Sequence, residues 1–411
     1  MKVQYWYRGE AVDDLRDLVL NHKFKPNWDY ILNEYIPYQT HITGRTFFEE
    51  VSVAPTCLFE PLSALGEQCF NRDIFTSSFD DYLNRYDYDE KELTMAAVSG
   101  GVDSSVVALE IKPDVIYSGY YDSEEYNELE YSSLIADTTN SNHHKILLTE
   151  QDFIDNMYEV MDAICTPVGG MGSVMEYTTL KKALSLVTNI NQVFFGNGGD
   201  EIFAGYHFNH FVKEFYERGF KVPYYMPNFQ ESSVKITENL IDFILVASMN
   251  RGPRSIMSSE FTNEFLLKKI DTMTSVISKL LYVNINITLP SLLHLNNQIC
   301  KSLEIKGFNP IANEELVRAA KRINTPLSDW PKMKLRKINP DLPEKIKTNF
   351  IKKGFPIPLD SWYNVRDFFE VAYDQFHMRP PVKLEKIPFN GINRYTWAIF
   401  QAEMCIRRFG L

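Results

Sequence analysis

Short apolar runs alternate with helical patterns between residues 93 and 195, and this alternation limits the fold more than any other feature. The apolar runs have the length of buried strands, whereas the segments between them carry apolar residues at helical spacing. Strands that alternate with helices predict an α/β fold with a doubly wound parallel sheet, in which ligands bind at the carboxyl ends of the strands. We expect strands at 93–98, 115–121, 143–149 and 192–195, and helices at about 102–112, 127–140, 150–164 and 174–187.

The first strand ends in the sequence SGGVDSS, Ser99–Ser105, which leads directly into a helix. Glycines let backbone N–H groups approach an anion, Ser hydroxyls add neutral donors, and the helix N-terminus is the positive end of a dipole. This turn therefore predicts a phosphate site, although it lacks the Gly-Lys-Ser/Thr ending of a Walker-type loop. Asp103 would repel a bare phosphate, so we interpret it as a ligand of Mg²⁺ on a polyphosphate. The alternative is an ordinary Gly/Ser turn with Asp103 as a helix-cap acid.

A second glycine-rich turn, GNGGDEIFAGY at 196–206, follows the strand expected at 192–195. Asp200 stands at the start of the next helix, as Asp103 does in the first turn. Because both turns follow neighbouring parallel strands, the two carboxylates could share one Mg²⁺ bound to a polyphosphate. Glu201 is either a third ligand or an acid in the first helical turn, and we favour the second interpretation.

These motifs carry a family resemblance. SGGVDSS resembles the pyrophosphate-binding loop of the N-type ATP pyrophosphatases, the PP-loop superfamily, and GNGGDEIFAGY is similar to the second motif of class B asparagine synthetases. Later segments follow in the order of that family, and the resemblance covers roughly residues 93–362. It implies a sheet of the PP-loop ATP pyrophosphatase type, with a helical C-terminal half and a short N-terminal α+β remnant. The later segments are the acidic helix that ends at His143 and His144, SLEIKGFNPIANEELV at 302–317, KMKLR at 332–336 and LPEKIKTNFIKKGFPIP at 342–358.

The resemblance implies an AMP-forming carbon–nitrogen ligase that uses ATP and Mg²⁺. ATP would adenylate a small-molecule or peptide carboxylate, and an amine or ammonia would attack the acyl-adenylate to form an amide. Asp103 and Asp200 would bind the metal. The residues implied for nucleotide binding are Val98, Ser99, Gly100, Gly101, Asp103, Ser104, Ser105, Gly119, Gly196, Gly198 and Gly199.

Three side chains become candidate catalytic residues through the same resemblance. Lys352 matches a lysine that neutralises the charge of pyrophosphate and of the tetrahedral intermediate, although its neighbour Lys353 could be confused with it. A solvated basic turn is the alternative for this segment. Glu304 matches a position that helps to deprotonate the amine, with a partly buried surface acid as the alternative. Lys332 belongs to the KMKLR helix.

The sequence departs from the family before the first motif. Position 2 is Lys, whereas glutamine-dependent members begin with a nucleophilic Cys, and only 98 residues precede Ser99. We therefore expect residues 1–88 to form a truncated N-terminal domain without glutaminase residues, and residues 89–411 to form the ligase domain. The segment 43–55 resembles the final hairpin of a glutaminase domain. The acidic stretch at 78–92 is either the domain boundary or a solvated helix face.

Two departures concern the substrate. Asn197 stands where family members carry an acid or a tyrosine, and Phe350 stands where an arginine is usual, so the resemblance does not extend to L-aspartate as the substrate. The amine is free ammonia, comes from a partner protein, or belongs to the substrate itself, as in β-lactam synthetases and lasso peptide cyclases. A tRNA-modifying relative and a non-catalytic ATP-binding subunit are the other hypotheses.

Composition excludes several classes of protein. A net charge of −12 disfavours general affinity for nucleic acid. The five cysteines are scattered without a C-x-x-C pair, so neither a disulfide framework nor a zinc site is expected. His143 and His144 are adjacent on a strand and point to opposite faces, which favours structural roles over a metal site. No apolar run approaches the roughly 18 to 20 residues of a membrane span, and we expect a cytoplasmic protein.

Overall fold

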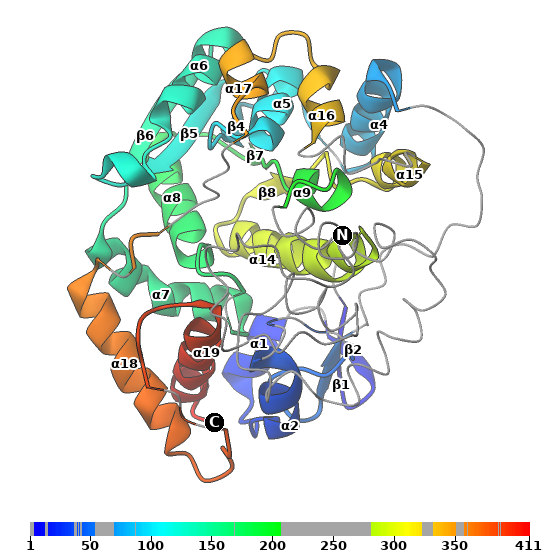
Figure 1. Ribbon diagram of the computed structural model, residues 1–411. Helices are drawn as coiled ribbons and strands as arrows, with labels where there is room; N and C mark the ends of the chain where they lie inside the picture. The colour runs from blue at the N-terminus through cyan, green and yellow to red at the C-terminus, as the bar shows by residue number, and fades with distance from the viewer. Residues whose placement is uncertain are drawn as a thin grey trace, which may run out of the picture.

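The computed structural model of the chain describes residues 4–12, 15–36, 39, 41, 43–53, 70–86, 88–167, 169–206, 281–322, 332–350, 357–359, 361–384, 386 and 388–411. Its centre is a five-stranded sheet with the strand order β6-β5-β4-β7-β8 (Figure 1). Each pair of neighbouring strands is parallel, which confirms the predicted α/β fold. The strands are β4 (Thr94–Ala97), β5 (Val115–Tyr120), β6 (Asn142–Leu147), β7 (Gln192–Phe194) and β8 (Lys306–Phe308).

The order of the strands reverses at β4. From β4 the chain passes through α5 (Val102–Ile111), β5 and α6 (Leu129–Thr139) to the edge strand β6. It then returns through α7 (Glu150–Ile164) and α8 (Ser173–Leu186) to β7, on the other side of β4. Met95 pairs with Val193, so the carboxyl ends of β4 and β7 reach the same edge of the sheet. In a doubly wound sheet this reversal leaves a crevice where ligands bind.

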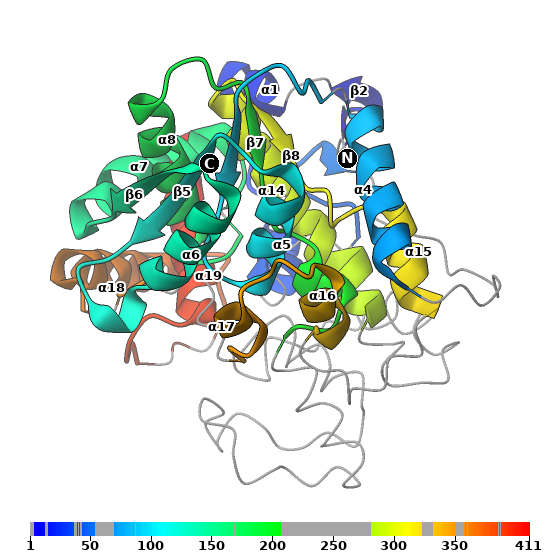
Figure 2. The same cartoon turned by 90° about the horizontal axis from the view of Figure 1, so that it is seen from above.

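Side chains of successive strand residues enter two separate cores, as the pleat of a strand requires. Met95 and Val193 belong to one core, while their neighbours Ala96 and Phe194 belong to the other. The first core is covered by α7, α8, α14 (Leu289–Ser302), α18 (Tyr363–His377) and α19 (Arg394–Phe409). The second is covered by α4 (Arg72–Arg85), α5, α6, α15 (Glu314–Arg322), α16 (Met333–Ile338) and α17 (Glu344–Lys347), and Figure 2 shows α15 beside α4.

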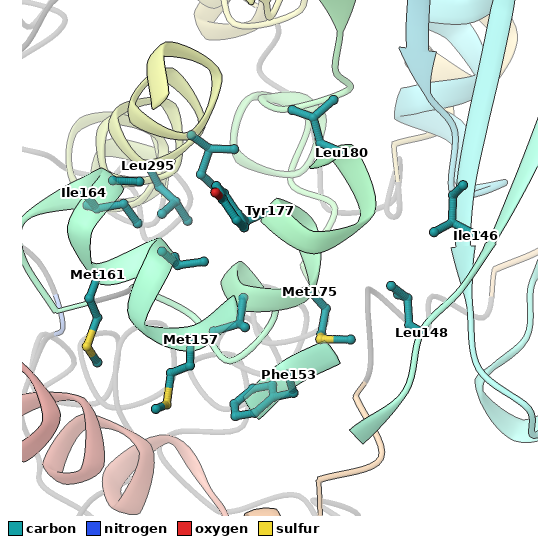
Figure 3. Packing of buried hydrophobic residues seen from close by; sticks show 14 of the residues in the cluster. Ile146, Leu148, Phe153, Met157, Met161, Ile164, Met175, Tyr177, Leu180 and Leu295 are labelled. Carbon is teal, nitrogen blue, oxygen red and sulfur yellow. The ribbon is translucent and has the colours of Figure 1, made fainter. Parts of the chain in front are cut away.

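Helices α7 and α8 contribute many side chains to the first core (Figure 3). Met157 and Met161 of α7 and Met175 and Leu180 of α8 all belong to this core, and all four side chains are almost completely buried. Flexible thioethers fill irregular gaps between packed helices. Leu295 of α14 adds to this cluster, so the helix that follows the undescribed range 207–280 is fixed against the sheet.

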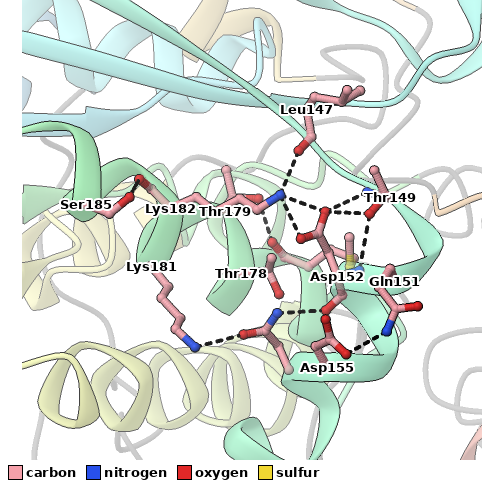
Figure 4. Close-up of polar contacts among 12 residues, drawn as sticks. Leu147, Thr149, Gln151, Asp152, Asp155, Thr178, Thr179, Lys181, Lys182 and Ser185 are labelled. Atoms are coloured by element: carbon pink, nitrogen blue, oxygen red, sulfur yellow. Dashed lines mark hydrogen bonds and ion pairs between the residues drawn. The ribbon is translucent and has the colours of Figure 1, made fainter.

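The start of α7 is fixed by a capping box. Asp152 N donates to Thr149 Oγ1 at 3.2 Å, and Thr149 N donates to Asp152 Oδ2 at 2.9 Å, as the spacing of the two residues predicts. Lys182 of α8 donates from Nζ to Asp152 at 2.7 Å and to the carbonyl oxygen of Leu147 at 3.1 Å (Figure 4). One lysine therefore joins α8 to the turn between β6 and α7.

The N-terminal region forms a small antiparallel sheet with the order β2-β1-β3, in which β1 (Tyr5–Tyr7) pairs with β2 (Glu10–Val12) and β3 (Val51–Val53). Helix α1 (Leu15–Asn21) and helix α2 (Trp28–Tyr30), which continues as a π-helical turn, follow β2. This region shares a core with α18 and α19, and Figure 1 shows its blue elements beside the red C-terminal helix.

Residues before 89 therefore contribute to two cores, because α4 packs against α15 on the large sheet while the small sheet packs on α19. The stretch 78–85 is helical, with Ser78 and Phe79 buried. Among the described helices, none combines the length and the hydrophobicity that a bilayer crossing requires.

Candidate active site

The two glycine-rich turns meet at the carboxyl ends of β4 and β7. Asp103 lies in the first turn of α5, and Asp200 lies in the first turn of the short helix α9 (Gly199–Ile202). A Cβ atom on Gly199 would overlap the Asp103 carboxylate, and one on Gly196 would lie 2.5 Å from the backbone nitrogen of Ser104. Only glycine allows this approach, which brings the two acids together.

Lys332 lies between the two acids. Its Nζ atom is 2.6 Å from Asp200 Oδ1 and also donates a short hydrogen bond to Asp103 Oδ2. The lysine side chain is only 5% exposed, and it reaches the acids from the residue before α16, with a left-handed backbone at φ 57°. Gly205 leaves room for it, because a Cβ atom there would overlap both Lys332 and Asp200.

These residues fit a divalent cation. Asp103 Oδ1 is buried and receives no hydrogen bond from any described residue. A buried carboxylate oxygen without a donor is costly, and hard cations such as Mg²⁺ prefer such oxygens. Two carboxylates and one ammonium leave the site with a formal charge of −1, which would attract a cation with its polyphosphate.

The first turn presents several neutral donors. Ser99 Oγ lies 3.3 Å from Ser104 Oγ and accepts a hydrogen bond from Gly101 N at 3.2 Å. Ser105 Oγ is buried and has no hydrogen-bond partner among the residues that the structure describes. Gly100 has φ 85°, and a Cβ atom there would overlap Tyr131 at the start of α6. The turn is thus held in one shape while Ser hydroxyls remain for an anion.

The other residues expected at the nucleotide lie along the same edge. Val98 is buried directly after β4, and its carbonyl oxygen accepts a hydrogen bond of 2.6 Å from Ser118. Gly119 is half-buried near the carboxyl end of β5. Gly198 has φ 105° and lies against Ala312 in the segment after β8. The carboxyl edge therefore gathers every residue that the resemblance implied for nucleotide binding.

Glu201 is 2% exposed, and Tyr206 donates a short hydrogen bond from its hydroxyl to Glu201 Oε1. Burial raises the pKa of Glu201. Glu201 lies in the first turn of α9, as the favoured interpretation expects, and it is buried against the Tyr206 hydroxyl.

The structure does not bring Glu304 to this group. Glu304 is exposed and precedes β8, whereas the two acids lie at the carboxyl edge. The strand between them separates its side chain from the site. Lys352 and Lys353 lie outside the described residues. His143 contacts Ser118 at 3.0 Å while His144 contacts Asn142 at 3.2 Å, and neither histidine belongs to a cluster of three or more histidines, cysteines or acids among the described residues.

Gly205 and Arg336 support the site, although neither was predicted as a site residue from the sequence. Gly205 is the last glycine of the second motif, so its place in that motif was a usable signal. Arg336 ends KMKLR and donates from Nη1 to the carbonyl oxygens of Ile346 and Lys347, at 2.9 and 3.0 Å. Its guanidinium also lies 4.7 Å from the ring centre of Phe350. Arg336 thereby joins the helix of Lys332 to the segment that leads toward Lys352.

Comparison with known proteins agrees with this geometry. The profile of the asparagine synthase family matches residues 93–388, which is more than half of the chain and includes both glycine-rich turns and Lys332. No curated protein matches the sequence. The chain belongs to the asparagine synthase family.

Proposed function

We propose that this chain activates a carboxylate by adenylation and then joins the acyl group to an amine, within the ATP-dependent, amide-forming ligase activity that its family implies. The observation that carries the proposal is the meeting of Asp103, Asp200 and Lys332 at the switch point of the sheet. Ligands of doubly wound sheets bind at this switch point, and the two acids and the glycine-rich turn at this edge support a site for a cation and a polyphosphate.

In this proposal Asp103 and Asp200 hold Mg²⁺, which neutralises charge on the β- and γ-phosphates when it is bound. The turn Ser99–Ser105 binds the phosphates through backbone N–H groups and Ser hydroxyls. Lys332 places a fixed positive charge beside the leaving pyrophosphate, where it stabilises the transition state without reorganisation. Lys352 is proposed as the second cation.

The proposed substrates are a small-molecule or peptide carboxylate and an amine or ammonia. Glutamine hydrolysis is not part of the proposed reaction. Asn197 supports a carboxylate other than L-aspartate, because an amide replaces an acid or a phenol beside the turn. A partner protein is a proposed source of the amine.

The experiment that tests this function is Mg²⁺-dependent exchange of labelled pyrophosphate into ATP, across a panel of amino acids and peptides. We expect exchange with one class of carboxylate and a loss of about a hundredfold or more in Asp200→Asn. Lys337→Met is the matched control, because Lys337 lies on α16 but is exposed. ATP binding without exchange for any carboxylate would favour a non-catalytic subunit.

A further inference from the structure

Three asparagines connect the second glycine-rich turn to an acid on α8. Asn197 Nδ2 donates to Asn309 Oδ1 at 2.8 Å, and Asn309 Nδ2 donates to Asn296 Oδ1 at 2.9 Å. Asn296 Nδ2 then donates to Glu176 Oε1 at 3.3 Å. Asn296 and Asn309 are buried, with exposed fractions of 1% and 4%. This series of hydrogen bonds, the asparagine chain, therefore crosses the first core from α8 through α14 to the carboxyl edge of the sheet.

This series of hydrogen bonds has a donor-to-acceptor direction, which runs from Asn197 to Glu176. An asparagine side chain can present its oxygen or its NH₂ group to a neighbour, so a chain of amides alone has two orientations. An ionised carboxylate only accepts, so Asn296 must offer NH₂ to Glu176. Asn296 then accepts from Asn309, and Asn309 accepts from Asn197. One carboxylate thus orients three amides.

Glu176 has no ion pair among the described residues, and its only hydrogen-bond donor there is Asn296. Burial raises the pKa of Glu176, because the charged form loses its hydration and costs free energy. A glutamine would fill the same space without that cost.

The oriented chain ends at Asn197, which is half-buried at the carboxyl edge between two glycines. Its Nδ2 atom is used by Asn309, whereas its Oδ1 atom has no hydrogen-bond partner among the residues that the structure describes. Gly199, two residues further on, touches Asp103 of the candidate cation site. A fixed hydrogen-bond acceptor therefore lies beside the place where an acyl group would be activated.

We propose that Asn197 Oδ1 accepts a hydrogen bond from the N–H group of the attacking amine, and that Glu176 is the positioning residue that keeps this oxygen available. This inference rests on the proposed function, since it assigns the amine side of that reaction. Asn197 orients the amine and takes up no proton. Asn296 and Asn309 transmit the orientation and touch no substrate.

The test separates adenylation from use of the amine. Pyrophosphate exchange reports adenylation, and hydroxamate formation at increasing hydroxylamine concentration reports use of an amine, with the carboxylate that gives the fastest exchange. In Glu176→Gln the chain can take either orientation. We expect exchange within about twofold of the wild-type rate, and about a fivefold higher hydroxylamine concentration for half-maximal rate.

A second variant keeps the carboxylate in the chain but moves it. In Glu176→Gln with Asn296→Asp, the new acid accepts from both Asn309 and Gln at 176, so the outer part of the chain regains its direction. We expect this double variant to return toward the wild-type hydroxylamine dependence. Glu159→Gln is the control, because Glu159 on neighbouring α7 is a 47% exposed acid that pairs with Lys181.

Each outcome is decisive. A purely structural role for Glu176 predicts that exchange and amine use fall together, with lower stability in urea, and this would overturn the inference. Wild-type amine dependence in Glu176→Gln, or no recovery in the double variant, would also overturn it while leaving adenylation in place. No exchange in the wild-type protein with any carboxylate would remove the proposed function, and the inference with it.

Discussion

Lys332 Nζ lies 2.6 Å from Asp200 Oδ1, and the same ammonium bonds Asp103, which is 229 residues away along the chain. The lysine therefore acts as a built-in counter-ion for the two acids of the candidate cation site. With the ammonium in place, the acids can be buried in close contact before any nucleotide binds. Their mutual repulsion would otherwise oppose the fold.

Replacing Lys332 by Met leaves two close carboxylates without their shared cation. We expect Lys332→Met to lower the free energy of unfolding by about 3–5 kcal/mol, the usual cost of breaking a buried ion pair. Added MgCl₂ should then restore more stability to the variant than to the wild-type protein. Urea unfolding with and without MgCl₂ measures both effects. An equal response of the two proteins to MgCl₂ would contradict a shared cation position.

A methyl group at Gly199 should damage the site directly. In Gly199→Ala the new Cβ atom overlaps the Asp103 carboxylate, so the two turns must separate. We expect pyrophosphate exchange to fall by about a hundredfold or more, because small displacements of reacting groups are costly. Gly170→Ala is the matched control, since nothing lies within 4 Å of a Cβ atom there. Wild-type exchange in Gly199→Ala would show that the contact between the turns is dispensable.

Stability should depend on pH through two histidines, His41 in the N-terminal region and His294 on α14. Burial lowers the pKa of His41 to about 4 and that of His294 to about 3. Both line a cavity of about 60 Å³, where His294 Nε2 contacts the Tyr5 hydroxyl at 2.7 Å. Between pH 6.5 and 4 the unfolded chain binds protons that the folded chain does not. The free energy of unfolding should therefore fall as the pH falls, by about 1.4 kcal/mol per pH unit for each histidine.

Substitution separates this effect from the titration of acids. His294→Gln should reduce the slope between pH 6.5 and 4, whereas His22→Gln, at an exposed site, should leave it unchanged. Urea unfolding at several pH values gives the slopes. If all three proteins share one slope, the buried histidines do not control the acid sensitivity.

The strands of the large sheet could be predicted from the sequence where apolar residues form a short run. Such runs coincide with β4, β5, β6 and β7. The bounds of these strands agree with the prediction within about two residues. β8 consists of Lys306, Gly307 and Phe308, which carry no strand pattern, so it becomes a strand only through pairing with β7. The small antiparallel sheet has strands of three residues, too short for periodicity to show.

The candidate site was readable only in part. Glycine-rich turns can be identified from a short stretch of sequence, and parallel strands bring such turns to one edge of the sheet. The closeness of Asp103 and Asp200 could therefore be predicted. The contact of Lys332 with both acids depends on packing between distant segments, which no local pattern contains. Glu304 shows the opposite case, because its motif follows the family order but Glu304 itself lies before β8, at the end of the strand away from the site.

The strand order has a consequence for how the candidate cation site is assembled. Asp103 follows the central strand β4. Asp200 follows β7, which comes after β5 and β6 in the sequence although it pairs with β4. Lys332 comes later in the sequence than all five strands. No fragment that ends before Lys332 contains all three groups. The site can therefore form only after all five strands of the sheet have been synthesised. A bound ion would hold together segments that the ribosome makes at widely separated times.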